Sequence, residues 1–210
     1  MIPFLRTGYE DFLPDLQEKW NQAYPYDTAD IFKKIVNKHT QKGRYYHNLS
    51  HLHSMLLLLD EYPEAIEHKK DVQLTIFFHD IIYDATKKGN EEKSARMAQK
   101  LLGEQCTQLI QQFILSTKKH QPLNNLHENA VLLDLDLAIL GGSLELYDAY
   151  RVAIRMEYNA YPKLLYKPGR KKVLQKFLER ERLYFTDYFY EKYERQARSN
   201  LKWELAHLDY

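Results

Sequence analysis

Apolar residues recur along most of this chain at intervals of three and four, which is the spacing of one helix face, and rarely alternate as in a β-strand. The seven glycines and seven prolines are few for 210 residues and mainly punctuate these helical segments. The pattern therefore predicts an all-α protein. Helices are expected at about residues 11–23, 28–39, 46–61, 71–83, 91–102, 107–119, 126–140, 144–160, 171–185 and 187–205.

Several of the predicted helix ends carry local signals. Asp27-Thr28 is suited to cap the start of the second helix, and Asn90 precedes an acidic first turn. Gly141-Gly142-Ser143 is expected to close one helix and to cap the next. These signals place helix boundaries, although only to within a few residues.

Two proline-containing breaks, Tyr161-Pro162 and Lys167-Pro168-Gly169, are suited to separate a core from a later segment. We therefore predict a single-domain helical bundle with two parts. Residues 1–165 are expected to form the core, including the N-terminal helices. Residues 166–210 are expected to form a C-terminal helical extension packed on it.

Composition narrows the class of protein. Hydrophobic residues make up 44% of the chain and charged residues 28%, which fits a folded globular protein rather than a disordered one. The formal net charge of +1 gives no general attraction to nucleic acid, so a nucleic-acid partner is not expected. The chain leaves open whether the protein forms a homo-oligomer.

Cysteine content and hydropathy favour a cytoplasmic protein. Cys106 is the single cysteine, so no intramolecular disulfide can form. Glu10 and Asp11 stand where a secretory signal would need an apolar run. The apolar run from Met55 to Leu59 is far shorter than the roughly 20 residues needed to span a bilayer, so no membrane segment is expected.

Histidines and aspartates interrupt several of the apolar segments. His47 and His51 are four residues apart, so in the predicted helix they project from the face that carries Met55 and Leu58 inward. The doublet His79-Asp80 follows a strongly apolar segment and is expected at a buried helix end. Side chains of this kind that point into a core require partners.

A second acidic pattern, Asp134-x-Asp136, lies inside the apolar segment 130–140, so at least one of these carboxylates faces an apolar environment. An unpaired carboxylate there would be costly or would become neutral. One shared cation would satisfy the imidazoles and carboxylates together. The sequence therefore predicts a divalent metal site whose mixed nitrogen and oxygen donors suit Mn²⁺, Fe²⁺, Co²⁺, Ni²⁺ or Zn²⁺ better than Mg²⁺.

Four sequence blocks occur in order between about residues 44 and 160. They are Tyr46-His47-Asn48-x-x-His51, Phe78-His79-Asp80-x-x-Tyr83-Asp84, Asn90-Glu91-Glu92-x-Ser94-Ala95 and Asp134-x-Asp136-Leu137-x-Ile139-Leu140-Gly141. In these blocks the chain resembles the HD superfamily of metal-dependent phosphohydrolases. It resembles more closely the small bacterial proteins described as predicted HD-superfamily phosphohydrolases. The resemblance implies a helical bundle of HD-domain type.

The resemblance also implies that His79 and Asp80 bind one divalent metal ion with an earlier histidine, which is His51 or His47. The first block is similar to that of cyclic-nucleotide phosphodiesterases, in which the second histidine binds metal and the first donates a proton. On this basis we assign His51 to the metal and His47 to general acid catalysis.

The last implied ligand is Asp136 or Asp134, and the superfamily pattern favours Asp136. Leu137 stands where the superfamily usually has Lys or Arg, so a phosphate contact from that position is not expected. Asp84 occupies a position similar to a catalytic acidic residue in HD hydrolases that cleave alarmone pyrophosphates. This similarity implies that Asp84 orients the attacking water.

Glu91 and His120 are further candidates for the site, each with a structural alternative. Glu91 is suited to contact substrate or a second metal, but it also fits an acidic first turn that favours the helix dipole. His120 is suited to extend the site to a second cation, but a lone histidine near a helix end is more often a solvated or capping residue.

Arg151 and Arg155 are one helical turn apart and are suited to hold a substrate phosphate. The alternative is that they pair with Asp148 or Glu157 at the surface.

Together these features predict an enzyme, a metal-dependent phosphohydrolase that cleaves a small phosphorylated substrate through a metal-activated water, with a nucleotide as the leading substrate. The chain has no GxGxxG or GxxxxGK loop, which disfavours kinases, P-loop ATPases and dinucleotide oxidoreductases. Two alternatives stay open. One is an HD-fold di-iron oxygenase, for which His120 and His127 are the available extra histidines, and the other is a metal-stabilised binding module that uses the basic, tyrosine-rich C-terminal helices.

Overall fold

The computed structural model describes residues 8–26, 29–123 and 125–208, and this part of the chain is helical throughout, without a β-strand. The prediction of an all-α protein is confirmed; the proposed cap at Asp27-Thr28 lies outside the described residues. The α-helices are α1 (Leu13–Ala23), α2 (Ala29–His39), α3 (Leu49–Glu61), α4 (Lys69–Phe78), α5 (Asn90–Leu102), α6 (Gln108–Thr117), α7 (His127–Leu137), α8 (Leu144–Glu157), α9 (Lys163–Leu178) and α10 (Asp187–Ala206). Two 3₁₀ turns, η1 (Gly103–Gln105) and η2 (Ala138–Gly141), follow α5 and α7.

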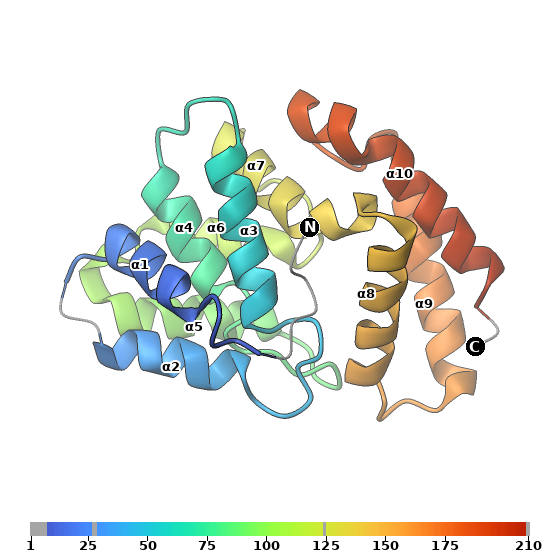
Figure 1. The fold of residues 1–210 in the computed structure, drawn as a ribbon, viewed down its shortest axis with the longest axis horizontal. Helices are drawn as coiled ribbons and strands as arrows, with labels where there is room; N and C mark the ends of the chain where they lie inside the picture. Colours follow the sequence, from blue (N-terminus) through green and yellow to red (C-terminus); the bar gives the residue numbers. More distant parts are fainter. Residues whose placement is uncertain (1–7, 27–28, 124, 209–210) are drawn as a thin grey trace.

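The helices fall into two groups (Figure 1). Helices α1 to α7 pack around one another and form the N-terminal group, while α8, α9 and α10 lie together on one side of it and form the C-terminal group. One continuous apolar core, which includes Trp20, Phe77 and Tyr184, runs through both groups. The predicted division between residues 165 and 166 stays a prediction, and α9 runs across it.

Contacts at η2 fix the C-terminal group on the N-terminal group. The side-chain amide of Asn200, on α10, donates to the carbonyls of Leu140 and Gly142 at 2.8 Å each. Gly141 lies so close to α10 that an added Cβ would be 2.5 Å from the Cβ of Tyr193. Only glycine fits at this point, so α10 can pack directly on the turn that follows α7.

Helix α9 differs from its prediction. A helix was expected at 171–185, after Pro168 and Gly169, but the helix begins at Lys163 and contains both residues. Proline deprives only the carbonyl four residues earlier of its partner, and that residue, Leu164, is 83% exposed, so water can replace the lost bond. Chain 180–185 is instead irregular, because the guanidinium of Arg198 binds the carbonyls of Arg180 and Glu181.

Two helices near the predicted site are also shorter than expected. Helix α3 begins at Leu49 rather than residue 46, because the side chain of Asn48 accepts the Ser50 N–H at 2.9 Å and caps the helix. Helix α4 ends at Phe78 rather than residue 83. Beyond it the Arg44 guanidinium takes the carbonyls of Asp80 and Ile81 as partners at 2.7 and 3.0 Å, which holds this segment in a turn.

None of the helices in the described ranges is long and apolar enough to cross a bilayer.

Candidate metal centre

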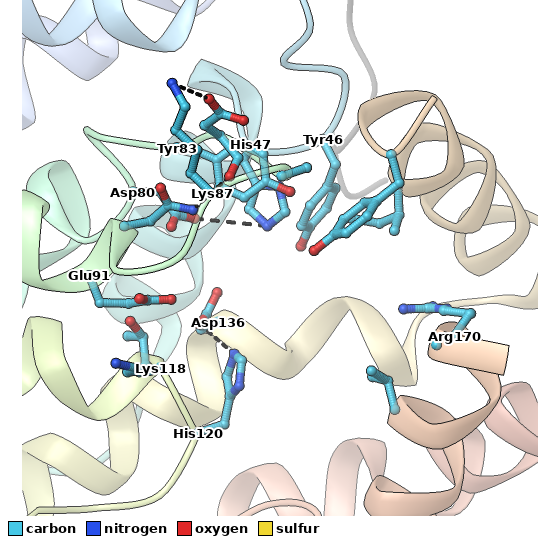
Figure 2. Close-up of a pocket in the computed structure, with 18 of the residues that line it drawn as sticks. Tyr46, His47, Asp80, Tyr83, Lys87, Glu91, Lys118, His120, Asp136 and Arg170 are labelled. Carbon is cyan, nitrogen blue, oxygen red and sulfur yellow. Dashed lines mark hydrogen bonds and ion pairs between the residues drawn. The ribbon is translucent and has the colours of Figure 1, made fainter. Parts of the chain in front are cut away.

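A cavity of about 610 Å³ lies between the two helix groups, and we call it the central cavity. Its N-terminal side carries His79, Asp80 and Asp136, while its C-terminal side is formed by residues of α8 and α9 such as Tyr150 and Arg170. Figure 2 shows Asp136 and Asp80 on one side of this space and Arg170 facing them from the other.

Three of the four predicted ligands come together at the floor of the central cavity. One ligand atom each of His51, His79 and Asp136 lies within 4.8 Å of the other two. The Oδ1 atom of Asp136 is 3.2 Å from His51 Nε2 and 3.9 Å from His79 Nε2. The three residues come from α3, the C-terminal end of α4 and α7, so the packing of three helices creates the group.

Both imidazoles in this group are 1% exposed, and their Nε2 atoms lack a hydrogen-bond partner among the described residues. The Nδ1 atom of His79 is 2.9 Å from the carbonyl of Ile76, which directs the opposite nitrogen toward Asp136. A buried polar atom without a partner is costly, and a cation would receive these lone pairs. The donor atoms therefore fit a divalent metal ion of the kind that binds imidazole and carboxylate together.

Asp80 borders the group. Its Oδ2 atom is 3.2 Å from His79 Nε2 and 3.9 Å from His47 Nε2. Burial alone would lower the pKa of His79, but the carboxylates of Asp80 and Asp136 outweigh it and raise this pKa to about 9. A bound cation would replace the proton on His79 and would pair with the same carboxylates. The role of Asp80 as a ligand stays a prediction.

The two late aspartates have different partners. Asp134 points away from the cavity, and its carboxylate accepts the N–H groups of Phe185 and Thr186 and the Thr186 hydroxyl, each at 2.8 Å. Asp136 faces His51 and His79; burial would raise its pKa, but the neighbouring histidines, first among them His120, lower it well below the usual range. Of the two alternatives left open by the sequence, Asp136 is the one in the metal group.

His47 does not lie on α3 as predicted, because that helix begins two residues later. A residue absent from the sequence-based site, Glu157 at the end of α8, holds it instead. Glu157 Oε1 accepts the N–H groups of Tyr45, Tyr46 and His47 at 2.8–2.9 Å. Its Oε2 accepts a hydrogen bond from His47 Nδ1 at 2.6 Å and another from the Tyr83 hydroxyl at 2.9 Å.

This arrangement favours the charged form of both partners. Burial raises the pKa of Glu157, but the His47 imidazole and the backbone N–H groups outweigh burial and lower it below its usual value. Burial lowers the pKa of His47, but Glu157 and Asp80 outweigh burial and raise it above its usual value. The sequence contains no signal for this contact, because the two residues are more than one hundred positions apart and Glu157 has the appearance of an ordinary helix-surface glutamate.

His120 and Glu91 both line the central cavity. His120 follows α6 with a φ of 46°, an uncommon left-handed conformation, and its Nε2 lies 3.2 Å from Asp136 Oδ2. Glu91 lies in the first turn of α5, on the side of the cavity that also carries Lys118 (Figure 2). His120 thus adds a further nitrogen next to the metal group, and its role in holding a second cation stays a prediction.

Asp84 lies at the edge of the central cavity, but its carboxylate is engaged by its own turn. It accepts the Thr86 N–H at 2.9 Å and the Thr86 hydroxyl at 2.6 Å, and it pairs with Lys87 at 3.3 Å. These contacts are those of a turn-forming aspartate. The implied role of Asp84 in orienting water stays a prediction.

Neither Arg151 nor Arg155, the two predicted phosphate contacts, lines the central cavity. Arg151 pairs with Asp148 at 2.5 Å, which is the alternative interpretation. Arg155 donates to the carbonyls of Tyr158 and Tyr161 at 2.7 and 3.1 Å. On α8 the cavity-facing positions are Tyr150 and Ile154, one residue before each arginine. Both guanidinium groups therefore lie on a different face of α8 and stabilise the C-terminal group instead.

The C-terminal side of the central cavity is rich in tyrosine. Tyr150, Tyr158, Tyr161 and Tyr166 line it together with Arg170, whose Nε and Nη2 each donate at 2.8 Å to the buried carboxylate of Glu204. The sequence did not single out Tyr150 or Arg170 as site residues. Their position depends on how α8 and α9 pack against η2, which the local pattern does not encode.

The chain matches no family model, no curated protein and no solved structure.

Proposed function

We propose that this protein is a metal-dependent phosphohydrolase that acts on a small phosphate ester. The observation that carries the proposal is the buried group of His51, His79 and Asp136, which lies beside the central cavity that His79, Asp136 and His47 line. The donor set suits Mn²⁺, Fe²⁺, Co²⁺, Ni²⁺ or Zn²⁺. When bound, such an ion supplies a Lewis acid that polarises a phosphoryl oxygen and lowers the pKa of water.

The resemblance to HD-superfamily phosphohydrolases supports the same activity. The order of an early histidine, a His-Asp doublet and a late aspartate corresponds to His51, His79-Asp80 and Asp136. These residues are far apart in the sequence but adjacent in space. A purely structural set of buried polar residues would be expected to form well-aligned hydrogen bonds, whereas the 3.2 Å contacts of His51 and His79 with carboxylates lack that geometry.

In the proposed reaction His47 supplies the proton that the leaving group needs. Water forms the new P–O bond, and the ester P–O bond breaks with its electron pair on the leaving oxygen. His47 Nε2 gives that oxygen a proton, and the proton released by water returns to His47 through solvent. The raised pKa of His47 favours the protonated imidazole that this role requires.

The central cavity is much larger than a phosphate group, which supports a substrate with a sizeable organic part. Lys87, Lys88 and Lys118 line the side next to the metal group and suit a phosphate. The tyrosines of α8 and α9 line the other side and suit an apolar or aromatic group. A nucleotide combines both features and is the leading candidate.

The proposal is tested by elemental analysis of the purified protein followed by a phosphatase screen over nucleotides, cyclic nucleotides and sugar phosphates with added Mn²⁺, Co²⁺ or Ni²⁺. We expect the purified protein to contain at least about one divalent ion per chain. We also expect it to show phosphatase activity, which His79→Ala abolishes. His127→Ala is the matched control, because His127 pairs with Tyr62 and Glu64 away from the site and should retain both metal and activity. Activity that survives His79→Ala would contradict the proposal.

A di-iron oxygenase is the second candidate, favoured by His120, whose Nε2 lies 3.2 Å from Asp136 Oδ2 and would be available to hold a second ion. His127, the other extra histidine, lies with Tyr62 and Glu64 instead. Two irons per chain together with substrate-dependent oxygen uptake would favour this candidate over hydrolysis.

A further inference from the structure

Glu157 accepts four hydrogen bonds from residues 45–47, the segment that carries a proposed catalytic group, and a fifth from the Tyr83 hydroxyl. The residue closes α8, and its side chain is fully buried. Three successive backbone N–H groups, from residues 45 to 47, converge on Oε1 and form a cradle of the kind that binds anions. The segment just before the cap of α3 is therefore folded around this carboxylate.

We propose that Glu157 is the positioning residue for His47, and that it orients the His47 imidazole so that Nε2 delivers the proton to the leaving group. The proposal rests on the proposed function. Glu157 Oε2 accepts the Nδ1–H of His47 at 2.6 Å, which commits Nδ1 to the interior. Nε2 is the remaining ring nitrogen, and it lies on the side of Asp80, 3.9 Å from Oδ2.

Two further contacts restrict the ring. The Tyr83 ring stacks on the His47 imidazole with 4.1 Å between centroids and 27° between planes, and the Tyr83 hydroxyl donates to the same Glu157 oxygen. On the backbone, Arg44 donates to the His47 carbonyl at 3.0 Å and to the Asp80 carbonyl at 2.7 Å. Stacking on Tyr83 thus fixes the plane of the imidazole, and the Arg44 contacts fix its backbone relative to the turn that carries Asp80.

The two sides of the site come from different helix groups. His51, His79 and Asp136 belong to the N-terminal group, whereas Glu157 belongs to α8 of the C-terminal group. The distance between the proton donor and the metal group is therefore set by the packing of one group on the other. Helix α8 therefore does more than close one side of the central cavity, because it also supplies the carboxylate that positions His47.

Glu157→Gln tests this role. The amide keeps the size of the side chain and an oxygen for the backbone cradle, but its NH2 group cannot accept the hydrogen bonds of His47 and Tyr83. Glu194→Gln is the matched control. Glu194 is equally buried, at 7% exposure, and accepts the N–H groups of Leu183 and Tyr184 far along the chain from the metal group. Like Glu157, Glu194 is a buried carboxylate that accepts backbone N–H groups, but it does not bind a histidine.

The measurement is kcat for two aryl phosphates, phenyl phosphate and 2,4-dinitrophenyl phosphate, with Zn²⁺ or Mn²⁺. Phenolate is a poor leaving group that needs a proton, whereas dinitrophenolate leaves without one. We expect Glu157→Gln to lower kcat for phenyl phosphate by about 10²-fold and kcat for the dinitrophenyl ester by less than about threefold. Glu194→Gln is expected to leave the ratio of the two rates unchanged.

Equal losses on both esters in Glu157→Gln would overturn the positioning role and leave a structural one. If the wild-type protein hydrolyses neither these esters nor any phosphate of the screen with any of the metals, the proposed function fails, and the ring orientation is then decided by NMR. In ¹⁵N-histidine-labelled wild-type protein loaded with Zn²⁺, a hydrogen-bonded Nδ1 proton of His47 that disappears in Glu157→Gln supports the orientation. Its absence from the wild-type spectrum contradicts it.

Discussion

The carboxylate of Asp134 binds both the backbone N–H and the hydroxyl of Thr186, each at 2.8 Å, and so joins α7 to the residue that caps α10. Asp136, two residues later, faces the opposite direction and contacts His51 and His120. Neighbouring aspartates on one short helix therefore serve different purposes, one in holding the two helix groups together and one in the candidate metal centre.

This division predicts opposite effects for two alanine variants. Asp134→Ala should lower the free energy of unfolding by about 3 kcal/mol, because it leaves buried N–H and hydroxyl groups without partners, and it should retain bound metal. Asp136→Ala should lose the metal. Urea unfolding and elemental analysis check both, and loss of metal in Asp134→Ala with retention in Asp136→Ala would reverse the assignment.

A second prediction separates the roles of His47 and His51. His47→Gln should retain metal but lose phenyl phosphatase activity by about 10²-fold or more, because a proton donor is removed and no ligand. His51→Gln should lose metal and activity together, since its Nε2 is one of the three donor atoms in the group. Metal content measured on both variants decides between the two roles. A metal-free His47→Gln protein would show that His47 is a metal ligand rather than a proton donor.

A third prediction concerns acid stability and His39, which lies outside the site. His39 is fully buried, its Nδ1 is 2.9 Å from the Ile35 carbonyl, and burial, with a smaller contribution from Arg44, lowers its pKa to about 3. Because the unfolded chain binds this proton near pH 6.5, the stabilisation is complete above that pH and is lost as the pH falls toward 3. Between pH 6.5 and pH 5 the loss should reach about 2 kcal/mol.

Urea unfolding of His39→Gln across this pH range should show an acid loss smaller than that of the wild-type protein by that amount. His207→Gln is the control, since His207 Nδ1 also lies close to the carbonyl four residues earlier, that of Trp203 at 2.8 Å, but on the exposed surface. A His39→Gln curve that parallels the wild-type curve would show that His39 is not held neutral.

A fourth prediction follows from the position of Arg151 outside the central cavity. Arg151→Gln should leave kcat/KM unchanged and lower the free energy of unfolding by about 1–2 kcal/mol, because the largely buried Arg151 side chain pairs with Asp148 and lies over the Trp203 ring at 5.4 Å. Steady-state kinetics with the best substrate of the screen, and thermal unfolding, measure both quantities. A large rise in KM would restore Arg151 to the phosphate site.

Local pattern was sufficient for the helical class and for a short set of candidate ligands, from which the family resemblance selected His51 and Asp136. Apolar spacing predicted an all-α chain because each helix buries one face, and His51, His79 and Asp136 stood out because polar groups in apolar segments need partners. The Ser143 cap of α8 was also predicted correctly: its side chain accepts the Leu146 N–H. These features depend on residues a few positions apart.

Features that depend on distant residues could not be predicted. Helix α9 passes through Pro168 because its affected carbonyl faces solvent, and chain 180–185 is irregular because Arg198 binds its carbonyls. The contact of Glu157 with His47 joins residues more than one hundred positions apart. Similarly, apolar spacing did not distinguish Asp134 from Asp136, whereas in the structure Asp134 binds Thr186 and Asp136 contacts His51 and His120.

The most direct test of the central claim is anomalous X-ray scattering from crystals of the protein grown with Zn²⁺. The account predicts a zinc peak about 2.0–2.2 Å from His51 Nε2, His79 Nε2 and an Asp136 oxygen, at the floor of the central cavity. Crystals in which zinc binds only elsewhere, while these three side chains remain without an ion, would contradict it.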